Sequence, residues 1–271
     1  MGWHPDWLVP QWPAPASVRA VCTTRAGGVS QGPFASLNLG DHVGDLPEHV
    51  ASNRATLEAT LQTQAVFMRQ VHGTEVLNLG LNGDLHPQAD AAISQEPGRA
   101  CLVMVADCLP ILLAHQSLPL VAAVHAGWRG LAGACGSAGG SPQGIVERTL
   151  DCMSAWAKCP LERLAPGLMA WLGPCIGPRA FEVGPEVYRA YTLVDPQAQA
   201  CFVPAGAGKF WADLPALARL RLARAGVLQC YGNEGSDDWC TVRNSGFFSH
   251  RASVLRHGVT GGRMAAGIWL V

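Results

Sequence analysis

Two histidines and one cysteine in this sequence have the residue types and the surroundings of metal ligands. They are His72 in the string RQVHG, Cys108 in ADCLP and His125 in AVHAGWRG, each at the edge of a predicted strand. A thiolate and two imidazoles suit zinc in softness and in charge. Three protein ligands leave a fourth position for water or substrate, where zinc lowers the pKa of water and polarises a substrate oxygen. These residues therefore predict a catalytic zinc site.

The spacing of these three residues leaves other interpretations open. It matches no short regular metal-binding motif, so the sequence alone does not prove that the three side chains converge. A histidine before a glycine at the end of a strand is commonly a turn residue. Cys108 lies in an apolar run, where a cysteine is commonly a small core residue. A metal site and an ordinary strand-end arrangement are both compatible with the spacing.

The chain between residues 66 and 125 must position these side chains, and it consists of short β-rich runs. Gly, Pro, Asn and Asp residues separate the runs, as is typical of strands joined by turns. Two runs, Cys101–Ala106 and Leu120–His125, are almost continuously apolar, which predicts strands buried on both faces. The predicted strands here are Val66–Val71, Glu75–Leu79, Ala89–Ile93, Cys101–Ala106, Ile111–Ala114 and Leu120–His125.

Further strands and helices flank this region and favour an α+β fold with one domain over residues 1–271. Residues 1–15 are predicted as an extended N-terminal arm, and the Gly- and Ser-rich residues 132–144 as a flexible surface loop. The flanking strands are predicted at Val18–Thr24, Met169–Leu172, Val227–Tyr231 and Met264–Val271, and the helices at Glu48–Leu61, Ile145–Ala157, Pro185–Thr192 and Asp213–Ala225.

The composition excludes several classes of protein. Of the 271 residues 49% are hydrophobic and 14% charged, and the net charge is −1, so a large core is available and the basic patch of a nucleic-acid-binding protein is missing. No basic and apolar leader opens the sequence, and no apolar run reaches the length of a membrane helix. The ten cysteines are scattered without a C-x-x-C pair. We therefore expect a protein of the reducing cytoplasm that does not bind membranes or nucleic acid.

Several longer strings resemble one known family along nearly the whole chain. They are TTRAGGVSQGPFASLNLGDHVGD, RQVHGTEV, ADCLPILL, AAVHAGWRG, GPCIGPRAFEVGPEV and CTVRNSGFFSHR, and in this order they are similar to the YfiH family. That family was first labelled multicopper polyphenol oxidase, or laccase-domain protein, and was later described as purine nucleoside phosphorylases. The resemblance implies an α/β/β/α sandwich with mixed sheets. It also implies that His72, Cys108 and His125 are zinc ligands.

The activity implied by the resemblance is the cleavage of adenosine or inosine by phosphate. Methylthioadenosine phosphorylase and adenosine deaminase activities in the same site are implied as well. The expected partners are therefore a purine nucleoside and phosphate, while the oligomeric state cannot be read from the sequence. Attack of a zinc-bound hydroxide on the purine C6 fits deamination. Phosphorolysis instead needs a positioned phosphate and a proton for the leaving base.

Further candidate residues lie in or beside the same strings, each with a structural alternative. Asp107 is a candidate general acid or base, or a carboxylate that caps backbone N–H groups. Arg129 is a candidate phosphate ligand, or one half of a salt bridge at a turn. The remaining candidates are predicted to bind substrate, although turn or core roles are open to them: Arg25, Asn38, His42, Gln70, Arg243, Phe248 and Arg251.

Three rival functions remain, and each makes a different demand on the sequence. A multicopper oxidase needs many imidazoles, generally as His-x-His pairs, and none of the nine histidines forms such a pair. Copper can still bind the single site, because it outcompetes zinc on affinity. Another zinc hydrolase would act without phosphate, and a structural or sensor protein would need a fourth protein ligand.

Two departures from the family pattern are His250, where many relatives have tyrosine, and a longer segment around 135–142.

Overall fold

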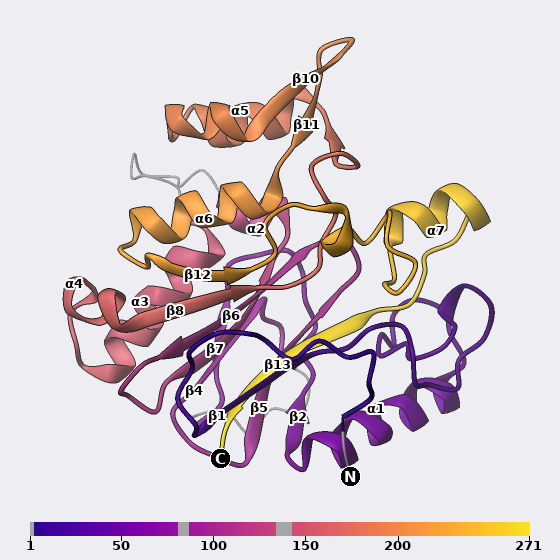
Figure 1. Ribbon diagram of the computed structural model, residues 1–271, viewed down its shortest axis with the longest axis horizontal. Helices are drawn as coiled ribbons and strands as arrows, with labels where there is room; N and C mark the ends of the chain where they lie inside the picture. Colours follow the sequence, from indigo (N-terminus) through magenta and orange to yellow (C-terminus); the bar gives the residue numbers. More distant parts are fainter. Residues whose placement is uncertain (1–2, 81–86, 134–142) are drawn as a thin grey trace.

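The computed structural model describes residues 3–80, 87–133 and 143–271, and two β-sheets dominate these residues (Figure 1). The first sheet has the strand order β1 (Val18–Cys22), β13 (Met264–Leu270), β5 (Arg99–Val105) and β2 (Gln64–Val66). The second has the order β12 (Gln229–Gly232), β8 (Leu168–Leu172), β6 (Leu109–His115), β7 (Val121–Ala126), β4 (Ala91–Ser94) and β3 (Val76–Asn78). Both sheets contain parallel and antiparallel pairs.

The alternation of side chains along the strands explains how the sheets stack. Successive residues of a strand point to opposite faces. In β6, Leu112 packs in one buried cluster with Cys101 of the first sheet, whereas Leu113 packs in another with Leu150. Every residue of β6 and β7 is buried, as predicted for strands covered on both faces. One face of each sheet therefore contributes to a core between the sheets.

Helices cover the outer face of each sheet and complete an α/β/β/α sandwich, which confirms the expected fold class. Leu57 of α1 (Pro47–Leu61) packs in one cluster with Leu102 and Trp269 of the first sheet. The second sheet is covered by α3 (Ile145–Ala157) and α6 (Leu214–Arg224). The remaining helices are α2 (Trp128–Ala132), α4 (Leu161–Leu164), α5 (Pro185–Thr192) and α7 (His250–His257).

A small third sheet lies at one end of the sandwich, at the top of Figure 1. It joins β9 (Glu182–Val183) to the hairpin of β10 (Phe202–Gly206) and β11 (Lys209–Ala212). None of these strands was predicted from the sequence, because β9 has only two residues and because Pro204 and two glycines interrupt the pattern of the hairpin. Among the described residues, no helix is long and apolar enough to cross a membrane.

Most predicted elements agree with the structure to within a few residues, but the strand Val66–Val71 is wrong. Strand β2 ends at Val66, where it last pairs with Cys101 of β5. Farther along, the side-chain amide of Gln70 donates to the Met104 carbonyl at 2.8 Å and accepts from the Met104 N–H at 2.7 Å. The Gln70 side chain thus occupies the N–H and carbonyl groups of β5 with which a longer β2 would have to pair.

The structure describes most of the predicted N-terminal arm but only a small part of the predicted loop 132–144. In the N-terminal arm, Leu8 pairs with Cys22 of β1 through two backbone hydrogen bonds of 2.8 Å. The predicted loop 132–144 falls largely outside the described residues, which stop at 133 and resume at 143. The division of residues 1–271 into one domain stays a prediction.

The core between the sheets predicts a large cost for truncating Leu112, which is 0% exposed. Leu112→Ala removes buried methyl groups and leaves a cavity, so we expect the free energy of unfolding to fall by about 2–5 kcal/mol. The matched control is Leu228→Ala, because Leu228 is 77% exposed. Urea unfolding followed by circular dichroism measures both, and equal stabilities would contradict this assignment of the core.

Candidate metal centre and cavity

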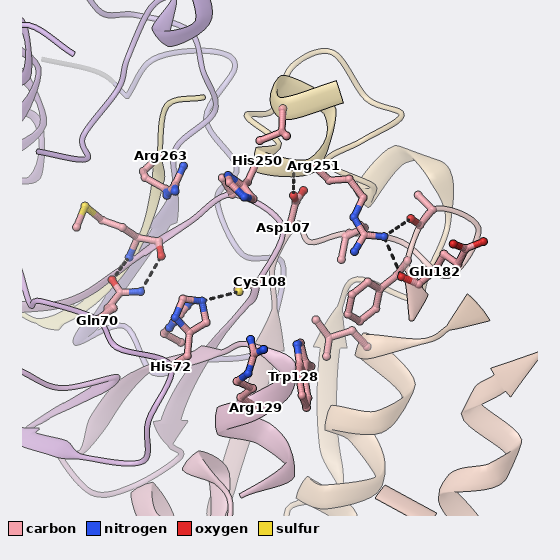
Figure 2. A pocket seen from close by; sticks show the side chains of 18 of the residues that line it. Gln70, His72, Asp107, Cys108, Trp128, Arg129, Glu182, His250, Arg251 and Arg263 are labelled. Atoms are coloured by element: carbon pink, nitrogen blue, oxygen red, sulfur yellow. Dashed lines mark hydrogen bonds between the residues drawn. The ribbon is translucent and has the colours of Figure 1, made fainter. Parts of the chain in front are cut away.

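Strand pairing brings His72, Cys108 and His125 together. Cys108 immediately precedes β6, and His125 lies at the end of β7, where it pairs with Pro110 in the antiparallel register. His72 belongs to the irregular segment between β2 and β3. The ligand atoms of the three residues lie within 4.8 Å of one another, and Cys108 Sγ is 3.6 Å from His72 Nε2 (Figure 2). The convergence that spacing could not prove is therefore present in the structure.

The donor set and its geometry fit a tetrahedral metal ion. A zinc ion with bonds of about 2.3 Å to sulfur and about 2.0–2.1 Å to nitrogen separates these two ligands by about 3.6 Å. The sulfur–nitrogen distance between Cys108 and His72 has this value. The three residues form a group that could hold a metal ion, and which metal binds remains a prediction.

A buried aspartate that the sequence analysis missed holds two of the three candidate ligands. Asp90 Oδ1 lies 2.8 Å from His125 Nδ1 and accepts the backbone N–H of His72 at 2.9 Å, while Oδ2 accepts the N–H of Gly73 at 2.8 Å and of Val71 at 3.2 Å. A carboxylate only accepts, so His125 donates from Nδ1 and its Nε2 lone pair is left for a metal. The available signal was a carboxylate inside the apolar run Ala89–Ile93.

The backbone around the centre adopts conformations that need such support. His72 has φ = 61° and Asp107 has φ = 96°, both in the region that non-glycine residues rarely occupy. Close packing adds a second demand at Gly127, where a Cβ atom would lie 2.9 Å from the His72 ring and 3.0 Å from Cys108 Sγ. Only glycine leaves room for both candidate ligands at this position.

The charges within the centre are strongly coupled. Burial alone raises the pKa of the Cys108 thiol, but the His125 charge and hydrogen bonds from both imidazoles outweigh it and bring the pKa to about 6. Burial lowers the pKa of His125, yet Cys108 and Asp90 raise it to about 9. Burial likewise raises the pKa of Asp90, while His125 and the backbone N–H groups bring it below its usual value. The centre thus favours a thiolate, the form that binds metals.

The centre opens into a cavity of about 930 Å³ whose lining combines arginine, aromatic and aliphatic side chains with the carboxylates of Asp107 and Glu182. Figure 2 shows Arg263, His250 and Arg251 on one side of Cys108, and Trp128 and Arg129 on the other. The aromatic lining residues are Trp128, Phe181 and Trp211. The sequence analysis did not single out Arg263 or these three aromatic residues. A cavity of this size admits a small organic ligand.

Asp107 and Arg129, the two further catalytic candidates, both line this cavity. Asp107 Oδ1 accepts the Thr241 hydroxyl at 2.6 Å, and Oδ2 accepts the Arg251 backbone N–H in the first turn of α7 at 2.7 Å. The Arg129 guanidinium lies 4.4 Å from the centre of the Trp128 ring and takes part in none of the ion pairs of the described residues. Arg129 therefore has its charge available to a ligand, and Asp107 holds two structural partners.

Three of the predicted substrate-binding residues, His42, Gln70 and Arg251, lie in the same lining. Gln70 uses its amide on the backbone of Met104, as described above. The Arg251 guanidinium donates to the Glu182 carbonyl at 3.0 Å and lies over the Phe181 ring at 5.5 Å. Arg251 thereby fastens the wall that carries Phe181.

The other four predicted substrate-binding residues are not in this lining. Asn38 is fully buried, where its amide binds Asp45 at 2.9 Å and accepts the Arg263 backbone N–H at 2.9 Å. Arg25, Arg243 and Phe248 line a separate, smaller cavity. Their predicted contact with substrate is untested and stays a prediction.

Comparison with known proteins places the whole chain among related sequences. Residues 19–271 match the family model described as multi-copper polyphenol oxidoreductase laccase. The chain is 46% identical over 267 residues to the purine nucleoside phosphorylase YfiH of Escherichia coli, covering 97% of this chain and 98% of that protein. It is 44% identical over 268 residues to a purine nucleoside phosphorylase of Pseudomonas aeruginosa, with 97% and 98% covered.

Solved structures are similar over the same length. A protein from Neisseria meningitidis superposes with a TM-score of 0.84 at 44% identity, covering 98% of this chain and 99% of that one. YlmD from Geobacillus stearothermophilus gives a TM-score of 0.85 at 30% identity, with 100% and 98% covered. The overall fold is thus shared by experimentally determined structures.

The hydrogen bonds of Asp90 predict that Asp90→Asn weakens metal binding without removing a ligand. An amide cannot accept from His125 and from all three backbone N–H groups, so we expect zinc affinity to fall about 10- to 100-fold. Competition with a chromogenic chelator measures the affinity. The matched control is Asp6→Asn, because the Asp6 side chain is 65% exposed and outside the cavity lining. Unchanged affinity in Asp90→Asn would show that the carboxylate does not position the ligands.

Proposed function

We propose, from the premise that the chain belongs to the YfiH family, that it is a zinc-dependent purine nucleoside phosphorylase that cleaves adenosine and inosine with phosphate. The observation that carries this proposal is the single cavity that joins the three-ligand centre to the Arg129 guanidinium and to aromatic groups. The names of the relatives from Escherichia coli and Pseudomonas aeruginosa support the same activity. We further propose that the same cavity acts on methylthioadenosine and deaminates adenosine.

The aromatic wall suits the base of a nucleoside. Phe181 and Trp211 lie in the lining, and the Arg251 guanidinium supports Phe181 from one side. Flat apolar rings bind a purine by stacking, at about 1–3 kcal/mol per base. Because β9 and β11 pair Trp211 with Glu182, this wall is part of the third sheet and is held in place by its register. We assign the purine to this wall.

The arginines of the cavity suit the phosphate that attacks the ribose. Arg129 lies at the exposed mouth, and its guanidinium provides a fork of donors that matches phosphate oxygens. Arg263 lies in the lining among backbone carbonyls, and its Nη1 donates to Gly261 O at 2.8 Å. His42 and His250 also line the cavity, but burial lowers the pKa of both imidazoles, so the positive charge offered to an anion comes from the arginines. We assign phosphate to the side that carries Arg129.

His72, Cys108 and His125 would hold the zinc ion in this proposal. When bound, zinc supplies Lewis-acid chemistry, since it polarises an oxygen ligand and lowers the pKa of water. Asp107 lies next to Cys108 in the lining and is our candidate for proton transfer with the leaving base. Its bonds to Thr241 and to the first turn of α7 fix the carboxylate against the cavity wall. Positioning by these fixed groups provides the entropic part of catalysis.

The description of the matching family model suggests a second function, that of a multicopper laccase, which the site supports less well than a phosphorylase. A multicopper oxidase needs several copper centres, each with its own set of imidazoles. In the part of the chain that the structure describes, His72, Cys108 and His125 form the one group of three or more potential ligands. Copper at this single centre remains part of the proposal only as an alternative metal.

The cytoplasmic location also stays a prediction.

Phosphate dependence in the purified protein tests the proposed reaction. We expect adenosine to yield adenine and ribose 1-phosphate only when phosphate is present, with about one zinc per chain by elemental analysis. The double variant His72→Ala with Cys108→Ala should lose zinc and at least 100-fold in rate, because the centre loses two of three ligands. Its matched control combines His49→Ala with Cys159→Ala, both outside the cavity lining.

Two outcomes would contradict the proposed function. Full activity in the ligand-deficient variant would exclude a metal-dependent reaction at this centre. Cleavage that proceeds equally without phosphate and releases free ribose would identify a hydrolase instead. Circular dichroism of each variant separates loss of activity from loss of fold.

Phosphate recognition by Arg129 gives a separate expectation. Arg129→Gln removes the charge but keeps a polar side chain, so we expect KM for phosphate to rise about tenfold, with a smaller change in KM for adenosine. Initial rates over a grid of both substrate concentrations measure the two constants. Arg148→Gln is the matched control, since Arg148 is exposed on α3 and does not line the cavity. An equal rise of both constants would place Arg129 outside the phosphate subsite.

A further inference from the structure

A second cavity, of about 100 Å³, lies against α7 and is lined by a different set of charged groups. The guanidinium groups of Arg25, Arg243 and Arg256 line it together with the imidazole of His257. The described residues of this lining include no aspartate or glutamate. The net charge of the chain is −1, so this cluster of positive charge does not follow from a basic overall composition.

Arg25 is held rigidly and yet keeps most of its donors unused. Its Nε donates to the Ala35 carbonyl at 2.7 Å, and its guanidinium lies over the Phe248 ring at 5.0 Å. Its Nη1 and Nη2 have no hydrogen-bond partner among the residues described. Arg256 lines the same cavity, and its charge, together with burial, lowers the pKa of Arg25. Such a pair is stabilised by an anion between them.

A buried hydroxyl also belongs to the lining of this cavity. Ser253 lines the same cavity and is 8% exposed, and its Oγ has no hydrogen-bond partner in the described part of the chain. A buried polar atom without a partner is destabilising, and a hydrogen-bonding ligand beside it would reduce that cost. Arg243 contributes less, because Asp237 lies 3.4 Å from its Nε.

We propose that this cavity is a second anion site, which binds a phosphate group through Arg25 and Arg256. The forked donors of two guanidinium groups match the oxygens of phosphate, and its charge offsets their repulsion. The volume of about 100 Å³ admits a phosphate group and is below the size of sites that enclose a whole nucleoside. The ligand is therefore inorganic phosphate or the phosphate group of a small phosphorylated molecule whose remainder extends into solvent.

The second anion site shares structural parts with the large cavity. Thr241 lines the second anion site, while its hydroxyl donates to Asp107 in the large cavity at 2.6 Å. Ser249, the N-cap of α7, also lines it, and the next residues, His250 and Arg251, line the large cavity. An anion here thus contacts the residues that position Asp107 and the first turn of α7. Binding itself does not depend on the proposed phosphorylase activity.

Equilibrium dialysis of the metal-loaded protein against radiolabelled inorganic phosphate tests the proposal. Arg256→Glu reverses one charge of the second anion site, on an exposed residue with no ion pair or hydrogen bond in the described structure. We expect phosphate binding at one site per chain to weaken about tenfold or more relative to the unmodified protein. Arg25→Met should remove the same site, and Arg148→Glu is the control with the same change of charge on α3.

The number of phosphate ions lost in each variant distinguishes a failure of the second anion site from a failure of the proposed phosphorylase function. If the large cavity also binds phosphate, we expect the bound phosphate to fall from two per chain to one in Arg256→Glu. If the large cavity does not bind phosphate, we expect it to fall from one per chain to none. Identical binding by Arg256→Glu and Arg148→Glu would overturn the second anion site in either case. Glycerol 3-phosphate as a competitor distinguishes the sources: displacement of the site's phosphate identifies a phosphorylated molecule as an acceptable ligand, and failure to displace it identifies inorganic phosphate.

Discussion

The carboxylate of Asp90 is the interaction on which the candidate metal centre depends. It is 0% exposed, and a buried charge of this kind is tolerated only when hydrogen bonds replace water. Asp90 meets this condition by accepting from the His125 ring and from three consecutive N–H groups around His72. One side chain thereby fixes the tautomer of one candidate ligand and the unusual backbone of another. Asp90, next to β4, thereby links the end of β7 to the segment before β3.

The antiparallel register of β6 and β7 contributes the rest of the geometry. Because Leu109 pairs with Ala126, the start of β6 and the end of β7 lie side by side at one end of the central strands of the second sheet. Cys108 and His125 are placed there by main-chain hydrogen bonds and by burial of both strands. The close contact at Gly127 then brings His72 against the sulfur. A site built on strands in this way is more precise than one built on loops alone.

Helix α7 connects the two cavities, and its first turn is where they meet. Asp107 binds the first turn of this helix through the Arg251 N–H and binds Thr241 beside it. The positive φ of Asp107 aims its carboxylate at both groups. Residues on one side of α7 face the large cavity, and others face the second anion site. Charges placed in either cavity therefore act on the same few hydrogen bonds.

The local pattern of the sequence was sufficient for the fold class and for most of the elements. Helices Ile145–Ala157 and Pro185–Thr192 have the predicted bounds, because their apolar spacing and terminal signals are local properties. Strand β2 was misjudged because the amide of Gln70 competes for the edge of β5, an interaction between residues distant in sequence. Strands β9 to β11 were missed because proline and glycine weaken their local signal.

For the candidate site, the sequence determined which residues have the chemistry, and only the tertiary structure decided which of them meet. His72, Cys108 and His125 could be named from their types and from the family strings, but their convergence follows from strand register. Asp90 was overlooked because its role exists only when four donors from two segments surround it. The separation of Arg25, Arg243 and Phe248 from the large cavity was equally unreadable, since residues adjacent in a motif can face opposite sides of one helix or loop. Residue types carry the chemistry, and contacts between distant segments determine where it acts.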